Sequence, residues 1–452
     1  MVERVTLSLL QSLRVGPSPK IAIVGAGGKT TLLFKLAAEF AGPVLITTTT
    51  HFGRWQLKNV NQRLFLDENA ELNVKELDIH NAKLISVTGK PTVDKRLSHL
   101  NNHALEQLKT FAENNSLPLL IEADGSRQKP IKAPRATEPV IPEWADLVCA
   151  LAGMEVLGKP NNEGFVHRPE RFKELTGCML DQTISATHMV KLLSHEEGGL
   201  KNIPKHARRV VVLNQADNLA VQALAEPIAE ALLSCYDTVL VTKLKGKLNG
   251  VKQAYQRIAA VILAGGASHR YGQPKQLLTW NGKPFIRWCV EASIQAGLDP
   301  VIVVLGANAE AIRPALTNLP VKIVDNPDWD EGKSSSLRVG VQSLPPETGA
   351  AIFLLADQPQ VTPELLNKMK SEHARSLAKI IAPTVDGRRT TPTLFDRSTF
   401  EELQKLLGDS GGRQLFSQYQ PRYFEYNDHR LALDIDQPED YQRFLRMMEN
   451  GG

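Results

Sequence analysis

A glycine-rich segment with two spaced cations, "LAGGASHRYGQPKQLL" at residues 263–278, carries the clearest chemistry in the sequence. Gly265 and Gly266 let backbone N–H groups approach phosphate oxygens, and Arg270 and Lys275 add positive charge. Nucleotidyl transfer needs such charge because it expels pyrophosphate and builds negative charge on the leaving group. A tight turn between a strand and a helix also needs glycine, so other segments must decide between the two interpretations.

Two acidic segments further along the chain have the residue types of a magnesium site. "FLLADQPQV" (353–361) places Asp357 just past an apolar strand, at the edge where open α/β sheets bind ligands. "LDIDQPEDY" (433–441) places Asp434 and Asp436 before the start of a helix. Each aspartate alone would also suit a helix cap or a turn. Together with the glycine loop, Asp357 and Asp436 predict a shared Mg²⁺ that bridges the α-phosphate and the attacking group.

Further motifs follow the glycine loop in a fixed order, so that the pattern extends over residues 258–447. They are NPDWDEGKSSSLRVGV (326–341), ADQP (356–359), GDSGGRQLF (408–416) and DIDQPEDY (434–441). In this order they resemble the MobA-like nucleotidyltransferases, and most closely the molybdenum cofactor cytidylyltransferases, which join molybdopterin to CMP. The resemblance implies a Rossmann-like α/β domain of the nucleotide-diphospho-sugar transferase type.

The resemblance also implies a role for each matching residue. Arg270 and Lys275 would bind the triphosphate, and Asp357 and Asp436 would hold Mg²⁺. Six more residues would lie around the nucleotide, the last two in a serine-rich loop: Leu263, Ala264, Gly265, Gly266, Ser335 and Ser336. The implied reaction is in-line attack by the terminal phosphate of molybdopterin on the α-phosphorus of CTP, with loss of pyrophosphate. Positioning and charge would then do most of the catalytic work.

One segment departs from the family pattern and leaves the acceptor open. "RRTTPTLF" (388–395) has Thr390 and Thr391 where relatives often have Gly and His or Asn. A sugar phosphate or polyol phosphate is therefore an alternative acceptor, since it would change only the pocket. GTP is an alternative to CTP, because guanylyl and cytidylyl members share most catalytic residues. A third interpretation is a non-catalytic, nucleotide-gated chaperone that delivers the cofactor.

A second phosphate-type loop, "AIVGAGGKTTL" (22–32), lies near the start of the chain. It ends in Gly-Lys-Thr-Thr but has Ile23 where a full Walker A motif has its first glycine. The predicted nucleotide-binding residues are Gly25, Gly27, Gly28, Lys29, Thr30 and Thr31, with Lys29 facing the β- and γ-phosphates. Thr30 and Asp124 are the predicted Mg²⁺ contacts, because "LLIEADGS" (119–126) puts Glu122 and Asp124 at the end of a strand.

The base that this first loop would select is left open between ATP and GTP. "VVVLNQAD" (210–217) resembles the Asn-Lys-x-Asp motif with which GTPases recognise guanine, through Asp217. Gln215 replaces the lysine of that motif, so an ordinary turn at the end of a strand explains the segment equally well.

The first half also resembles a family of its own. Its motifs are VGAGGKTT (24–31), TTTTHF (47–52), EADGSRQKPIKAPRATEPVIP (122–142) and HRPERF (167–172). They resemble the YqeC-type proteins, which are associated with selenium-dependent molybdenum hydroxylases. This resemblance implies a maturation role and transient contact with an apo molybdenum hydroxylase. Five residues are candidate anion or substrate contacts, although each also suits a structural role: His51, Arg127, Lys129, His167 and Arg168.

Strands and helices alternate in both halves, which predicts mostly parallel sheets covered by helices. In the first half, strands are expected at 20–25, 43–50, 117–124, 145–153, 208–214 and 237–244. In the second, they are expected at 258–266, 299–306, 321–327, 349–357 and 378–383. The basic, glycine-containing stretch 243–257 interrupts this alternation. We therefore predict a P-loop-like domain at 1–250, a linker at 251–257 and a MobA-like domain at 258–452.

Length and composition exclude several other classes of protein. A chain of 452 residues is long enough for two or three domains. The net charge of +4 is too small to indicate a nucleic-acid partner. The sequence has neither a signal peptide nor an apolar run of the roughly 18–20 residues that a membrane span needs. Four dispersed cysteines predict free, buried thiols, and with them a cytoplasmic protein.

Overall fold

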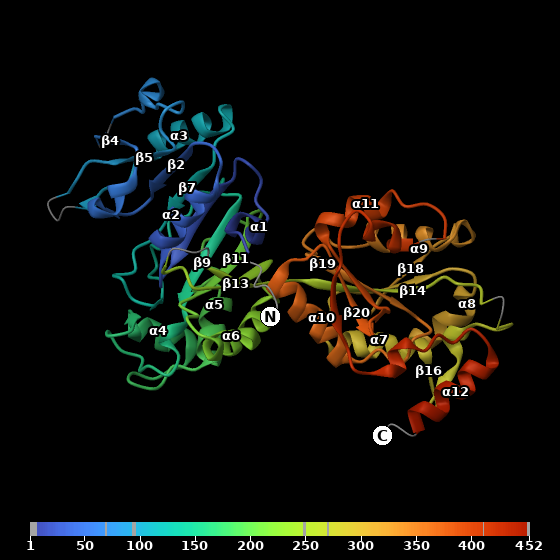
Figure 1. The fold of residues 1–452 in the computed structure, drawn as a ribbon. Helices are drawn as coiled ribbons and strands as arrows, with labels where there is room; N and C mark the ends of the chain where they lie inside the picture. Colours follow the sequence, from blue (N-terminus) through green and yellow to red (C-terminus); the bar gives the residue numbers. More distant parts are fainter. Residues whose placement is uncertain are drawn as a thin grey trace. The chain divides into compact units, whose positions relative to one another are not determined.

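The computed structural model describes residues 7–67, 70–92, 96–246, 250–268, 271–409 and 411–449. The chain forms two compact units, Met1–Tyr255 and Gln256–Gly452, and each is an α/β unit with its own sheet (Figure 1). This confirms the predicted fold class. Within the ranges given, no helix has the length and apolar character needed to cross a membrane.

The first unit is built on a long sheet with the strand order β13-β12-β11-β9-β1-β7-β2-β5-β4. Every neighbouring pair from β12 to β4 is parallel. The strands are β1 (Lys20–Gly25), β2 (Val44–Thr48), β4 (Gln62–Leu66), β5 (Leu84–Gly89), β7 (Leu119–Glu122), β9 (Leu147–Gly153), β11 (Arg208–Asn214), β12 (Thr238–Thr242) and β13 (Val251–Gln256). All residues of β2, β7, β9 and β12 are buried, as expected for a parallel sheet covered on both faces.

Helices and short strands complete the first unit. The helices are α1 (Leu9–Leu13), α2 (Lys29–Glu39), α3 (Asn102–Asn114), α4 (Pro169–Thr176), α5 (Ala186–Ser194) and α6 (Leu219–Leu232). The short strands are β3 (Phe52–Gly53), β6 (Arg96–Leu97), β8 (Ile131–Lys132) and β10 (Val166–His167). Helix α2 follows β1 through the glycine loop, and its apolar stripe of Leu32, Leu33 and Leu36 is buried, as its spacing predicts.

The stretch expected to be a linker is mostly a strand. Residues 251–256 form β13 at the edge of the first sheet, and Leu7 makes an isolated antiparallel bridge to Val251 on it. Basic and glycine residues nearby suggested a loop, but Val251, Ala254 and Tyr255 are buried. Only Arg257 separates β13 from the first strand of the second unit.

The second unit has a mixed sheet with the order β18-β17-β14-β19-β22-β20-β21, and β23 pairs with β20. Its strands are β14 (Ile258–Ala264), β17 (Val301–Leu305), β18 (Lys322–Asp325), β19 (Ala350–Leu355), β20 (Ile380–Val385), β21 (Arg388–Arg389), β22 (Thr393–Asp396) and β23 (Arg422–Glu425). The four strands from β18 to β19 are parallel, whereas β22 runs antiparallel to both of its neighbours.

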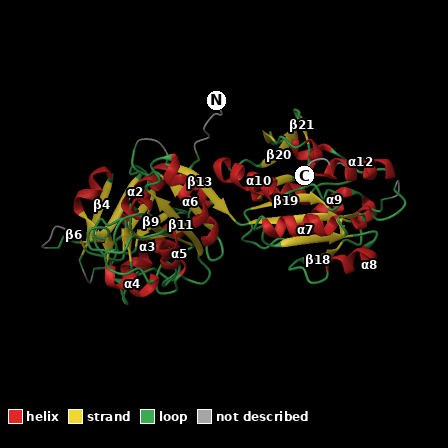
Figure 2. Cartoon of the chain, turned by 90° about the horizontal axis from the view of Figure 1, so that it is seen from below, coloured by secondary structure: helices red, strands yellow, loops and turns green. Residues whose placement is uncertain are grey.

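Helices cover both faces of this second sheet, as Figure 1 shows, and Figure 2 views the sheet from the side of α7. On one face, α7 (Phe285–Gln295) and α10 (Pro363–Ser376) pack against Ala260 and Ile262 of β14. On the other, α9 (Lys333–Gln342) and α11 (Phe400–Gln404) pack against Ala259 and Val261. Alternate residues of β14 thus belong to two separate cores. A small two-stranded sheet and two further helices complete the unit: β15 (Thr279–Trp280), β16 (Lys283–Pro284), α8 (Ala309–Ile312) and α12 (Pro438–Glu449).

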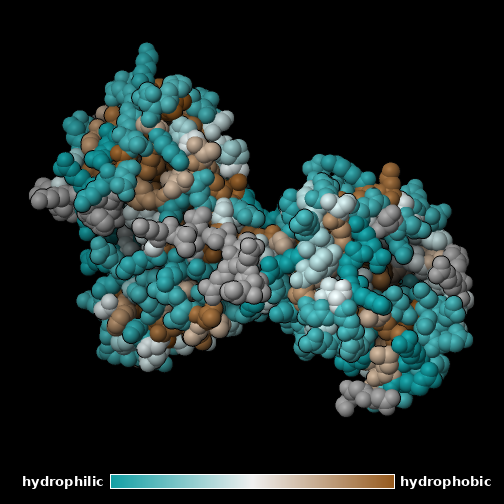
Figure 3. Space-filling view, in the orientation of Figure 1, coloured by the Kyte–Doolittle hydropathy of each residue, from teal (hydrophilic) through white to brown (hydrophobic). Residues whose placement is uncertain are grey.

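The surfaces of the two units have the character of water-exposed protein. The face drawn in Figure 3 is mostly hydrophilic, with apolar residues in small groups. The four cysteines, which all lie within the described ranges, form no disulfide; Cys149, Cys178 and Cys289 are buried and Cys235 is partly buried.

Candidate functional site

In the second unit, the glycine loop leaves the end of β14 and passes very close to other backbone. A Cβ atom at Gly265 would lie 2.8 Å from Ser336 Oγ, and one at Gly306 would lie 2.7 Å from the Gly265 Cα. Larger residues would therefore move the loop. The close approach keeps the backbone of residues 264–266 next to the ends of β17 and β14, where open α/β sheets bind ligands.

A buried glutamine that the sequence analysis did not select fixes this loop. Gln276 Nε2 donates to the carbonyls of Ala264 and Gly266, at 3.3 and 3.1 Å. The side chain is 5% exposed, so these bonds have little competition from water. Sequence spacing gave no signal for Gln276, because its partners are backbone carbonyls brought near by the fold. It acts through the loop and is a positioning residue.

Three of the predicted residues meet at one point. Lys275 Nζ lies 3.0 Å from Asp357 Oδ2, 3.0 Å from Asp436 Oδ1 and 2.8 Å from the Ile435 carbonyl. Lys275 begins a short 3-10 turn, Asp357 follows β19, and Asp436 precedes α12. Burial lowers the pKa of Lys275, but the two carboxylates outweigh burial and raise that pKa overall. The ammonium is therefore charged at neutral pH.

This group of side chains suits a divalent cation that is shared with a nucleotide. The ammonium of Lys275 already occupies the position between two carboxylate oxygens, and such oxygens are the ligands that Mg²⁺ prefers. Within the described part of the chain, no set of three or more His, Cys, Asp or Glu side chains is arranged around a metal position. Mg²⁺ commonly uses one or two carboxylates and completes its shell with phosphate oxygens and water. The residues present fit that mode of binding.

A third carboxylate, Asp434, lies near enough to Asp436 and Asp357 for their charges to act on it. The Asp434 residue is exposed, but partial desolvation of its carboxyl together with the charges of Asp436 and Asp357 raises its pKa. The sequence analysis noted Asp434 but did not assign it to the metal.

The two predicted serines lie on a helix, not in a serine-rich loop. Ser335 and Ser336 are buried in the first turn of α9. Asn326 Nδ2 donates to both hydroxyls, at 2.8 and 3.0 Å, and Ser335 Oγ donates to the Gly332 carbonyl. Ser335 thus keeps a local hydrogen bond to the backbone at the start of the helix, and the bonds from Asn326 tie both hydroxyls to the segment after β18. Ser336 lies next to Gly265 of the glycine loop, and a place for the two serines near a nucleotide stays a prediction.

The segment expected to face the acceptor lies beside the acidic loop. Thr391 donates a hydrogen bond to Gln358 Oε1, and Thr390 Oγ1 donates to the Leu431 carbonyl at 3.0 Å. Gln358 directly follows Asp357 in the sequence. Arg270, the other predicted phosphate ligand, lies outside the described residues.

In the first unit, the glycine loop between β1 and α2 has a conformation that requires glycine. Gly25, Gly27 and Gly28 all have positive φ angles, of 90°, 85° and 126°. Asn214 Nδ2 holds the loop by donating to the Gly27 carbonyl at 2.6 Å, while its Oδ1 accepts from Thr242 Oγ1 and from another backbone N–H. Asn214 belongs to the Asn-Gln-Ala-Asp segment, so that segment contacts the loop through its first residue.

Lys29 and Asp124 meet as a buried ion pair. Their Nζ and Oδ1 atoms are 3.1 Å apart, and their side chains are 3% and 2% exposed. Asp124 also accepts from the Gly25 N–H at 2.9 Å and from Lys132 Nζ at 2.8 Å. Burial raises the pKa of Asp124, but the charges of Lys29 and Lys132 outweigh burial, so the net shift is downward. Asp124 is thus an ionised carboxylate held by N–H donors.

Thr30 and Asp124, predicted as contacts of one Mg²⁺, have different partners. The Thr30 hydroxyl donates to Glu122 Oε2 at 2.9 Å, whereas the known partners of Asp124 are the ammonium groups and a backbone N–H. Burial raises the pKa of Glu122. Two ammonium groups beside Asp124 oppose a metal ion at that carboxylate in this arrangement.

The ion pair extends into a network that the sequence did not indicate. Lys132 Nζ lies 2.8 Å from Glu138 Oε2, and Arg168 Nη2 lies 3.0 Å from the same oxygen. Lys132 and His167 are register partners on β8 and β10. Burial and the charges of Arg168, Lys132 and Arg127 lower the pKa of His167 to about 4, so its ring is neutral at pH 7.

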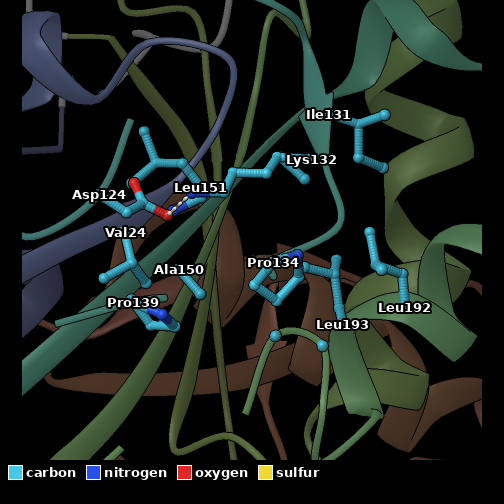
Figure 4. Close-up of a pocket in the computed structure, with 14 residues that line it drawn as sticks. Val24, Asp124, Ile131, Lys132, Pro134, Pro139, Ala150, Leu151, Leu192 and Leu193 are labelled. Carbon is cyan, nitrogen blue, oxygen red and sulfur yellow. Dashed lines mark hydrogen bonds and ion pairs between the residues drawn. The ribbon is translucent and has the colours of Figure 1, made fainter. Parts of the chain in front are cut away.

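A small cavity of about 30 Å³ adjoins this network at the ends of the central strands (Figure 4). Asp124 and Lys132 supply its charged groups, and apolar side chains supply most of the rest, among them Val24, Ile131, Leu192 and Leu193. The volume is enough for about one or two water molecules. Asp217, the residue proposed to recognise guanine, is exposed and lies 3.9 Å from Lys243 Nζ.

Comparison with known proteins assigns each unit to a family. The model of the MobA-like NTP transferase domain matches residues 260–423, and the model of the YqeC protein matches residues 21–170. The second unit is therefore a nucleotidyltransferase domain, whose substrate is a nucleoside triphosphate. The chain belongs to the YqeC family through its first unit and joins that unit to a MobA-like NTP transferase.

Individual relatives match one unit each. The first unit is 34% identical over 221 residues to the uncharacterized protein YqeC of Escherichia coli, which covers 46% of this chain and 82% of that protein. The second is 26% identical over 198 residues to nicotine blue oxidoreductase of Paenarthrobacter nicotinovorans (42% of this chain, 96% of that protein). It is 25% identical over 197 residues to a probable molybdenum cofactor guanylyltransferase of Bacillus cytotoxicus (42% and 96%).

Proposed function

We propose that the second unit transfers CMP from CTP to the molybdopterin cofactor and releases pyrophosphate. The observation that carries this proposal is the meeting of Lys275, Asp357 and Asp436 within 3.0 Å at the ends of the strands. It supplies a cation for the triphosphate and two carboxylates for Mg²⁺. The similarity to a protein named as a molybdenum cofactor guanylyltransferase supports a molybdopterin acceptor.

In the proposed reaction, the chain's own residues position two substrates. An oxygen of the terminal phosphate of molybdopterin forms a bond to the α-phosphorus of CTP, and the bond from that phosphorus to the β-phosphate oxygen breaks. Lys275 neutralises the departing pyrophosphate, and the backbone at Gly265 and Gly266 holds the nucleotide close to the sheet. Asp357 and Asp436 would hold Mg²⁺, which supplies positive charge at the phosphates when it is bound. No covalent enzyme intermediate is needed.

The acceptor is proposed to lie along residues 388–395. Thr391 hydrogen-bonds Gln358, the neighbour of Asp357, so this segment borders the proposed metal ligands. In-line attack requires the acceptor phosphate to approach the α-phosphorus from the side opposite to the departing pyrophosphate.

A pyrophosphate-release assay tests both substrates at once. CTP, GTP and ATP are each offered with molybdopterin, and separately with a panel of sugar and polyol phosphates. We expect release only with CTP and molybdopterin. Pyrophosphate release with GTP but not with CTP would mean that the nucleotide substrate is GTP. Release with a sugar phosphate but not with molybdopterin would mean that the acceptor is a sugar phosphate. Binding of CTP without any turnover would favour the nucleotide-gated chaperone.

We further propose that the first unit binds the phosphates of ATP or GTP at residues 25–31 and acts in the maturation of an apo molybdenum hydroxylase. The three positive-φ glycines and the N-terminus of α2 support an anion site at this loop. Equilibrium dialysis with ATP and GTP tests it, using Lys29→Met against Lys173→Met, a partly exposed lysine of α4, as the matched control. Equal binding by both variants would remove Lys29 from the site.

A further inference from the structure

Lys275 stands between the two carboxylates that the proposed function assigns to a metal ion. Its Nζ atom has three oxygen neighbours at 2.8–3.0 Å, two of them from Asp357 and Asp436. An ammonium in that position satisfies the carboxylates electrostatically. A divalent cation bound to the same two carboxylates would lie a few ångströms from the ammonium. The ammonium would repel it, because like charges at that distance interact strongly in a partly buried site.

We propose that Lys275 is a built-in counter-ion that keeps free Mg²⁺ out of the site until a nucleoside triphosphate arrives. The metal and the nucleotide then enter together, as a metal–triphosphate complex. This inference rests on the proposed function of the second unit, because it takes Asp357 and Asp436 as the metal ligands. It adds an order of binding and a role for Lys275 before any substrate is present.

The triphosphate is the ligand that can release this arrangement. It carries enough negative charge to become the new partner of the Lys275 ammonium, which frees both carboxylates. It also brings the phosphate oxygens that a Mg²⁺ ion held by two carboxylates needs to complete its shell. Without the triphosphate, the described residues offer the metal neither a vacant carboxylate pair nor a third acidic or histidine ligand around a common position.

The exposure of the three side chains allows this exchange of partners. The side chains of Lys275, Asp357 and Asp436 are 16%, 25% and 55% exposed, so water and ligands reach them. Ion pairs that water can reach exchange partners more readily than fully buried pairs, because water solvates the charges that separate. The lysine side chain is also long enough to turn toward a phosphate while Gln276, its neighbour, keeps the loop in place.

Binding of Mn²⁺ to the full-length chain without nucleotide tests the proposal. Free Mn²⁺ is measured by electron paramagnetic resonance for the wild type and for Lys275→Met. We expect Lys275→Met to bind Mn²⁺ at least tenfold more tightly than the wild type, because the carboxylates lose their counter-ion. The control is Lys283→Met, which removes an ammonium paired with Glu291 and is expected to leave Mn²⁺ binding unchanged.

A double variant ties the new affinity to the proposed ligands. Lys275→Met combined with Asp357→Asn should lose the gain in Mn²⁺ affinity. The proposal is overturned if Lys275→Met binds Mn²⁺ no more tightly than the wild type while its circular dichroism and thermal midpoint are unchanged. It is also overturned if the double variant keeps the gain. A Lys275→Gln variant repeats the test where the methionine variant does not fold.

Failure of this inference is distinguishable from failure of the proposed function. The Mn²⁺ measurement needs no acceptor and no turnover, so it decides the role of Lys275 even when no nucleotidyl transfer is found. Conversely, pyrophosphate release by a wild type that binds free Mn²⁺ as tightly as Lys275→Met would leave the transferase intact and remove the counter-ion role.

Discussion

Each unit contains a lysine that follows a glycine loop and is paired with an aspartate from a neighbouring strand end, but the two pairs differ in burial. Lys29 and Asp124 are 3% and 2% exposed, and Lys132 joins them as a second buried ammonium. The side chains of Lys275 and Asp357 are 16% and 25% exposed. Lys275 also pairs with Asp436, whose side chain is 55% exposed. The same residue types thus form a fixed network in one unit and an exchangeable pair in the other.

The difference follows from the cost of moving a charge. A buried ion pair that loses one partner leaves an uncompensated charge in a medium of low polarity, which costs several kcal/mol. An exposed pair that loses one partner gains water instead. Burial therefore predicts that Asp124 contributes mainly to stability, and that Asp357 contributes mainly to ligand binding. Four substitutions test this comparison, from the largest expected effect to the smallest.

Asp124→Asn should destabilise the first unit by about 3–5 kcal/mol, because Lys29 and Lys132 keep their charges and lose their carboxylate. Urea denaturation followed by circular dichroism measures the change. Glu174→Gln, which removes the exposed partner of Arg171 in the same unit, should leave the denaturation midpoint nearly unchanged. Equal effects of the two substitutions would contradict the contrast between buried and exposed pairs.

Asp357→Asn should lower kcat for pyrophosphate release at least 100-fold, which corresponds to about 2.7 kcal/mol of transition-state stabilisation. Its thermal midpoint should match that of the wild type, in contrast to Asp124→Asn. Asp325→Asn is the matched control, since it removes an exposed aspartate paired with Arg313 in the same unit. An Asp357→Asn enzyme with normal kcat would exclude Asp357 from the site.

Asn214→Ala should destabilise the first unit by about 1–3 kcal/mol, because Thr242 and the Leu244 N–H lose a buried acceptor. It also removes the hydrogen bond to the Gly27 carbonyl, so ATP or GTP binding should weaken beyond the loss of folded protein. Asn81→Ala changes an exposed asparagine of the same unit and should be neutral in both measurements. If Asn214→Ala changed neither stability nor nucleotide binding, the glycine loop would keep its conformation without the hydrogen bond from Asn214.

The smallest effect concerns pH. Because the pKa of His167 is about 4 in the folded protein and about 6.5 in an unfolded chain, the unfolded chain binds the proton first as pH falls. His167 therefore favours the folded state above pH 6.5, and this advantage is lost as pH falls toward 4. The half-buried ring limits the loss to less than about 1 kcal/mol between pH 7 and 5.5.

His167→Gln should accordingly reduce the fall of the thermal midpoint over that pH range. His103→Gln, which changes an exposed histidine beside Glu71, serves as the control and should leave the pH dependence as in the wild type. A His167→Gln variant with the full pH dependence would mean that other groups cause it.

Much of the fold was predictable because it is encoded locally. Unbroken apolar runs such as 147–153 and 301–305 belong to strands that are buried on both faces, and the leucine spacing after Lys29 belongs to a helix. The strand β13 was missed because its lysine and glycine neighbours have the composition of a loop. Its burial depends on the edge of β12, which lies outside any local window.

The rule that a charged residue just after a strand suits phosphate or metal selected Asp357 and Asp124. The structure pairs each of them with the lysine that follows a glycine loop, and their roles at a site stay predictions. The rule did not find the ion pair of Lys132 and Glu138. Lys132 lies on the two-residue strand β8, and Glu138 lies in the loop that follows this strand. The serine-rich loop implied by the family resemblance is instead the first turn of α9, where Asn326, from the segment after β18, donates to the Ser335 hydroxyl.

The single residue between β13 and β14 has a practical consequence for dividing the chain. A protein that ends at residue 250 would lack β13 and present β12, a wholly buried strand, as an unpaired edge. Unpaired apolar edges recruit strands from other molecules and cause aggregation. A cut directly after Gln256 would leave both sheets whole. The choice of a few residues thus decides whether β12 keeps the neighbour that covers its edge.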